Sequence, residues 1–222
     1  MDIKEVYLRF KQKINKNYTN DEVASSKSRF VYIFNEVQNN YLEWMLDNKS
    51  VDDREYIQKF LTLDKALDSS DNLLNHSDFK LPENYFFHSN LQVEASSGGC
   101  TDFLHVHQIK QENLNEYFHD NFNEPSFLYR ETFYTIGEDS INIYKKGFNI
   151  SNAYLTYYRY PRQVDIERYL GEEGLQSSSN INPEWDDKSV NRILTAAAAL
   201  FNQNNEDFQH LQFDKSRIFN KI

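Results

Sequence analysis

Residues 154–162 have the sequence YLTYYRYPR, and this stretch constrains the fold more than any other part of the chain. β-Branched and aromatic residues favour a strand, and a proline ends one because it lacks the N–H group that the ladder needs. Residues 181–187 then read INPEWDD, where Asn182 is a good helix N-cap and Pro183 suits the first helical position. The two segments together predict a chain that leaves a sheet and returns to a helix.

Apolar side chains at helical spacing predict further helices near both ends of the chain. The predicted helices cover residues 3–14, 26–48, 56–61 and 183–201, and a last amphipathic stretch covers residues 206–222. Between them the pattern changes to alternation and short turns, which predicts strands. The predicted strands are residues 85–87, 91–93, 103–109, 132–136, 140–144 and 153–160, with a short helix at 112–119.

Helices followed by strands and then by helices predict an α+β fold rather than a doubly wound parallel sheet. We expect the N- and C-terminal helices to pack as a bundle, with an antiparallel β region inserted between them. Short turns join the last three strands, so these are expected to form an antiparallel meander. The expected helical body is residues 1–64 and 180–222, the β insertion is 78–162, and 65–77 and 163–179 are connecting loops.

The composition limits the classes of function. The 222 residues include 34 acidic and 24 basic side chains, and the net charge of -10 argues against a protein that grips nucleic acid through its phosphates. The single cysteine, Cys100, excludes an internal disulfide and a cysteine-based zinc site. We expect no signal peptide, and no apolar run approaches the ~18 residues of a membrane span.

Motifs for chemistry are few. The sequence lacks the glycine-rich phosphate-binding patterns and the G-x-S-x-G pattern of a nucleophilic serine. His105 and His107 lie two apart on a predicted strand and share a face, so with His119 they could bind a metal, although histidines facing water or a partner are the simpler interpretation. Cys100 has no Cys-His-Asn signature around it. We therefore expect no catalytic, cofactor-binding or metal-binding residues, no cofactor, and no enzymatic activity.

The tyrosines and arginines of residues 154–162 allow two functional interpretations. Tyr154, Tyr158 and Tyr160 could stack on a single-stranded nucleic acid, but the acidic charge disfavours this, and aromatic residues on strands usually pack against neighbours. Arginine beside tyrosine is also the composition of protein–protein hot spots. Arg159 and Arg162 are therefore predicted interface residues, with plain surface arginines at a strand end as the equally simple alternative.

Several blocks of the sequence, in order, resemble a neck ring protein of crAss-like bacteriophages. The N-terminal blocks are EVYLRF at 5–10, KINKN at 13–17, TND at 19–21, FNEVQN at 34–39 and DDREYIQK at 52–59. The C-terminal blocks are residues 154–162 and NPEWDDKSVNRI at 182–193. The resemblance runs nearly from end to end, and none of its blocks is a catalytic signature.

The resemblance implies a structural virion protein, a head-to-tail connector (adaptor) that combines a helical bundle with a β element. It implies a homo-oligomeric ring of twelve copies in the neck, assembled in the bacterial host cytoplasm, with the portal protein and other neck or tail ring proteins as partners and no membrane. Genomic DNA would pass through its channel without specific binding. The predicted interface residues are Arg159, Tyr160 and Arg162, and at the basic C-terminal end Lys215, Arg217, Phe219 and Lys221.

Two other functions stay open at this point. The first is another virion structural or binding module, such as a tail hub or cargo protein. The second is a histidine-based metal hydrolase, which would use the His105 and His107 pair.

Overall fold

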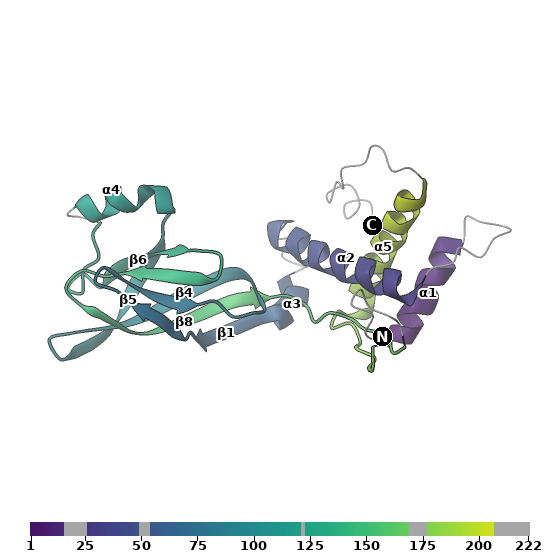
Figure 1. Cartoon of the computed structure of the whole chain (residues 1–222), viewed down its shortest axis with the longest axis horizontal. Coiled ribbons are helices and arrows are strands. Elements are labelled where there is room, and N and C mark those ends of the chain that lie inside the picture. The colour runs from purple at the N-terminus through teal and green to yellow at the C-terminus, as the bar shows by residue number, and fades with distance from the viewer. Residues whose placement is uncertain (16–25, 49–53, 121–122, 169–176, 207–222) are drawn as a thin grey trace. The chain divides into compact units, whose positions relative to one another are not determined.

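The computed structural model describes residues 1–15, 26–48, 54–120, 123–168 and 177–206. The chain divides into two compact units (Figure 1). The helical unit is Met1–Lys59 together with Pro161–Ile222, and the sheet unit is Phe60–Tyr160.

The helical unit contains α1 (Ile3–Asn15), α2 (Lys27–Asn48), α3 (Arg54–Ile57) and α5 (Asp187–Glu206). In Figure 1, α2 runs across α1 and α5, with which it is in contact. The three long helices meet at Phe10, whose ring centre lies 5.0 Å from that of Phe30 and 5.6 Å from that of Phe201. All three side chains are fully buried, and each such burial contributes roughly 1.5–3 kcal/mol.

The helices predicted at 3–14 and 26–48 are confirmed. Within the described ranges, none of the helices combines the length and apolar character that crossing a membrane requires.

The start of α5 corrects one detail of the prediction. The helix begins at Asp187, and its cap is Asp186, whose Oδ2 accepts the N–H groups of Lys188 at 3.0 Å and Ser189 at 3.2 Å. Asn182 instead caps α1, because its Oδ1 accepts the N–H of Ile3 at 2.9 Å. The predicted N-cap residue therefore caps a helix that lies 179 positions earlier in the chain.

The sheet unit contains one eight-stranded, curled sheet that makes a half-barrel. Its strand order is β1-β8-β4-β5-β6-β7-β3-β2, so the first two strands along the chain lie at opposite edges. The strands are β1 (Leu61–Ala66), β2 (Ser69–Asn72), β3 (His76–Lys80), β4 (Tyr85–Ser97), β5 (Cys100–Gln108), β6 (Glu131–Ile136), β7 (Ser140–Tyr144) and β8 (Asn149–Arg159).

Only Leu67 and Asp68 join the two edge strands. The N–H of Leu67 donates to the carbonyl oxygen of Ala153 on β8, and the carbonyl oxygen of Asp68 accepts the N–H of Lys80 at the end of β3. Three residue steps, from Ala66 to Ser69, span at most about 11 Å. A flat sheet of eight strands would hold its edges about 33 Å apart, at about 4.7 Å for each neighbouring pair. The sheet must therefore curl until its edges approach each other at this link.

The predicted fold class is wrong in its β part, although the broader α+β class holds. The sheet is not a small antiparallel insertion: it has eight strands, and β5 and β6 pair in parallel. The connection between these two strands includes η2 (Gln111–Asn113) and α4 (Leu114–His119), and a parallel pair needs a crossover of this length. Residues 65–77, expected as a connecting loop, contain the end of β1, all of β2 and the start of β3.

The predicted meander of the last three strands is also wrong. β6 and β7 do form an antiparallel pair, but the second neighbour of β7 is β3 and the neighbours of β8 are β4 and β1. β8 ends at Arg159, and Pro161 follows without an N–H to continue the ladder. The strand predicted from YLTYYRYPR therefore exists, but it lies near the other edge of the sheet.

The two faces of the sheet bury different groups. The inner face holds the main core, which includes Val93, Ile141 and Leu155. On the outer face, Phe133 and Tyr144 form a second cluster with Ile109, against which residues of α4 pack. Figure 1 shows α4 beside β6, and this placement explains why successive residues of β6 are buried on both faces of the sheet.

Replacing Asn182 by alanine should destabilise the helical unit by about 1 kcal/mol, because the N–H of Ile3 loses its acceptor. Trp44 and Trp185, the two tryptophans of the chain, both lie in this unit, so their fluorescence during urea unfolding measures it separately. Asn182→Asp keeps an acceptor oxygen at a helix N-terminus and should restore most of the loss. Equal stability of wild type and Asn182→Ala would contradict the capping role.

Candidate functional site

Arg159 and Tyr160 lie together where β8 ends. The guanidinium carbon of Arg159 is 5.6 Å from the centre of the Phe60 ring, and its Nη1 donates to the carbonyl oxygen of Tyr160 at 3.1 Å. The Tyr160 ring packs 4.6 Å from that of Phe86 and is 41 % exposed. The arginine is thus oriented by its own chain, and part of the tyrosine surface is exposed.

Arg162 belongs to the helical unit, where its main chain is anchored. Its N–H donates to Oε2 of Glu184 at 2.8 Å, and its carbonyl oxygen accepts from Nε2 of the buried Gln38 at 3.2 Å. The residue itself is exposed. The remaining predicted interface residues, Lys215, Arg217, Phe219 and Lys221, lie outside the described residues.

The histidine pair on β5 has the predicted shared face. The rings of His105 and His107 are nearly parallel, 6.1 Å between centres, and both residues are exposed. Nδ1 of His119 lies 2.7 Å from the carbonyl oxygen of Asn115, one turn earlier along the chain. Across the part of the chain that the structure describes, no group of three or more histidine, cysteine or carboxylate side chains is placed to hold a metal ion.

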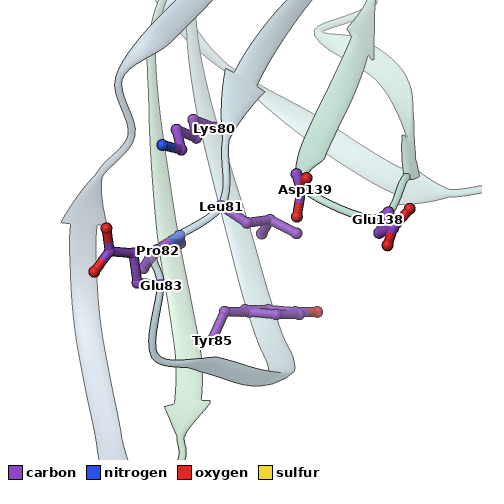
Figure 2. A pocket seen from close by; sticks show the side chains of 7 residues that line it. All are labelled: Lys80, Leu81, Pro82, Glu83, Tyr85, Glu138 and Asp139. Atoms are coloured by element: carbon purple, nitrogen blue, oxygen red, sulfur yellow. The ribbon is translucent and has the colours of Figure 1, made fainter. Parts of the chain in front are cut away.

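The sheet unit has a cavity of about 370 Å³ at one end of the sheet, which we call the mouth. It is lined by the end of β3 and the following loop, the start of β4, and the turn between β6 and β7 (Figure 2). The N–H of Leu81 donates to the carbonyl oxygen of Asp139 at 2.8 Å and ties two of these segments together. The lining residues are Lys80, Leu81, Pro82, Glu83, Tyr85, Glu138 and Asp139.

The side chains of the mouth divide into two kinds. In Figure 2, the ring of Tyr85 and the side chain of Leu81 project toward the turn that carries Glu138 and Asp139. Lys80 and Glu83 project to the other side of the loop. The hollow thus has an aliphatic and aromatic wall facing two carboxylates, which suits an apolar side chain flanked by a cation.

Buried and half-buried aromatic groups lie near Tyr85 in the sheet. The Tyr85 ring is 5.8 Å from that of Tyr157, whose hydroxyl donates to Oδ1 of Asn84 at 2.8 Å. The His88 ring meets the buried Tyr134 ring edge-on at 6.3 Å. The β4–β8 register shifts next to Tyr85 and next to His88. Such bulges commonly change the direction in which a strand's side chains point.

Burial favours the uncharged forms of Tyr85, His88 and Tyr134 by shifting their pKa values. It raises the pKa of Tyr134 to about 12, with a smaller contribution from Tyr85. Burial likewise raises the pKa of Tyr85 and lowers the pKa of His88. Neutral phenols and a neutral imidazole favour packing and hydrogen bonding over proton transfer near pH 7.

The sequence contained no signal for the mouth. Its seven lining residues are separated by up to 59 positions and match no motif, and only the pairing of β3 with β7 brings them together. No protein-family model and no curated protein matches the sequence. The geometry therefore identifies a hollow, and it does not connect that hollow to a known activity.

The sheet unit should lose stability as the pH falls below about 6.5, the usual pKa of histidine. The unfolded chain protonates His88 before the folded chain does, because burial lowers its folded pKa, so protons favour unfolding. Hydrogen exchange of the β4 and β8 amides between pH 7 and 5 measures this loss. Its pH dependence should weaken in His88→Gln and stay unchanged in the exposed control His107→Gln; the reverse result would contradict the assignment.

Proposed function

We propose that the protein is a structural component of a bacteriophage neck, a ring that joins the portal to the tail and extends the DNA channel. The observation that carries this proposal is the way the chain is divided. Both ends of the chain build one helical unit, and a separate sheet unit is inserted between them. This is the plan, a helical bundle combined with a β element, that the sequence resemblance implies for a connector.

The division also meets a requirement of ring assembly. Subunits of a ring make head-to-tail contacts, so each copy needs two different surfaces that complement each other. The two units have separate cores, around Phe10 in one and Val93 in the other, so each can present its surface as a rigid part. This supports a ring subunit without identifying which surfaces meet.

The charge of the chain supports a channel through which DNA moves. The sheet unit has 14 acidic and 7 basic side chains, a net charge of -7, and the helical unit carries the remaining -3. Twelve copies at -10 each would carry -120. An acidic channel repels phosphates and releases no counterions from them, so DNA would slide without being held.

The decisive measurement compares the purified chain with and without the portal protein encoded by the same genome. We expect native mass spectrometry to show a discrete complex containing twelve copies bound to the portal, and electron microscopy to show a ring at the portal vertex. A chain that neither binds the portal nor appears in the neck would overturn the proposal. Assembly at another virion layer would favour the tail-hub or cargo alternative.

The basic C-terminal end gives a second test. Because Lys215, Arg217 and Lys221 cluster there, removal of residues 213–222 should abolish portal binding. Far-UV circular dichroism should stay unchanged if the fold is retained. Portal binding by the truncated chain at wild-type strength would show that this end is not the docking segment.

A further inference from the structure

Two turns of the sheet unit hold apolar side chains out in water. Leu73 is 52 % exposed, Leu74 91 %, Leu128 82 % and Tyr129 74 %, and we call these four residues the apolar tip. Single exposed apolar residues are ordinary, but four on two turns at the same end of a sheet are characteristic of an interaction surface.

The strand pairing places both turns at the same end of the sheet. Leu73 and Leu74 precede the start of β3, and Leu128 and Tyr129 precede the start of β6. β3 and β6 flank β7, and both are antiparallel to it, so their starts lie together at the end of β7.

The same three strands reach the mouth at their other end. β3 ends at Lys80, and the turn after β6 carries Glu138 and Asp139, all of which line the mouth. Strands of five or six residues are about 17–20 Å long. The tip and the mouth are therefore two different surfaces at opposite ends of one small block of sheet.

Intrachain contacts hold the tip in place. The buried Lys145 contacts Oδ1 of Asn72 and Oγ of Ser77, on the two strands that flank the first turn, and its N–H donates to the carbonyl oxygen of Asn75. In the second turn, the N–H groups and carbonyl oxygens of Ser126 and Glu131 bond to each other. The exposed side chains are thus presented on pinned turns, which lowers the entropic cost of docking.

The charges near the two surfaces are balanced differently. Arg130 and Lys146, with side chains 66 % and 55 % exposed, lie next to the tip, each in a surface ion pair with Asp102 or Glu124. Three carboxylates and one lysine line the mouth, together with Leu81, Pro82 and Tyr85. In a docked pair, an apolar knob flanked by two ion-paired cations would therefore meet a hollow with an apolar wall and a net acidic rim.

We propose that the apolar tip of one copy docks into the mouth of a second copy. The two surfaces differ, so the contact is head-to-tail, and repeated contacts of this kind close into a ring when the rotation between copies allows it. The inference rests on the proposed ring function and deepens it, because it assigns the contact between subunits to the sheet unit.

Cross-linking between full-length chains tests the contact directly. In a Cys100→Ser background, one preparation carries Leu74→Cys in the tip and the other carries Glu138→Cys in the mouth. After mixing and oxidation we expect at least about tenfold more mixed dimer than from the pair Leu63→Cys and Glu138→Cys, because a specific contact raises the effective concentration of the thiols. Leu63 is a matched control, since it is an exposed leucine of the sheet unit, at 67 %, outside the tip.

A yield equal to the control overturns the proposal, and so does a dominant product linking two copies that both carry Leu74→Cys, which indicates a symmetric contact. Association measured by sedimentation should weaken at least about tenfold in Leu74→Asp, the loss of a central apolar contact, and stay unchanged in Leu63→Asp.

Two further results would overturn the proposed tip contact without disproving the ring. If the Leu74→Asp chain forms portal-bound rings normally, the tip does not mediate the contact between copies. The proposed neck function would then be unaffected. Binding of the wild-type chain to vesicles of phosphatidylcholine and phosphatidylglycerol, lost in Leu74→Asp, would assign the tip to a membrane surface instead.

Discussion

The two-residue link of Leu67 and Asp68 is the constraint on which the sheet unit depends. It joins the outermost strands of an eight-stranded sheet, and its backbone groups bond to β8 on one side and to β3 on the other. The sheet must curl to satisfy a connection that short, and its concave face then closes around Val93, Ile141 and Leu155. The mouth lies at the end of β3, where residues 81–84 lead into β4.

Local patterns predicted the elements that carry their own periodicity. α1 and α2 were predictable because one stripe of each helix is apolar, and β8 because its run of tyrosine, leucine and threonine favours a strand. β2 was not predictable, since its residues are Ser, Ser, Asp and Asn, all exposed, and only its partner β3 makes it a strand. The pairing of β7 with β3 was not predictable either. β3 lies about 60 positions earlier in the chain, and no turn signal reports a pairing at that distance.

The candidate residues divide in the same way, into those with a local sequence signal and those brought together only by the fold. Arg159 and Tyr160 were found from composition, because arginine beside tyrosine at a strand end is a local feature, and the structure places them together. The cap of α1 by Asn182 and the mouth at Leu81 and Asp139 each join residues that are far apart in sequence. Such sites depend on topology, which no local motif of the sequence reports.

In the proposed ring, the unequal charge of the two units would link the tip contact to the channel. A net charge of -7 on the sheet unit would oppose the approach of neighbouring sheet units in a ring. The proposed contact would bring Arg130 and Lys146, each paired with a carboxylate of its own chain, toward the carboxylates of the mouth and would offset part of this repulsion. Acidic groups that take no part in the contact would still repel DNA. Assembly and DNA passage would then place opposite demands on charge, and different surfaces of one sheet would meet them.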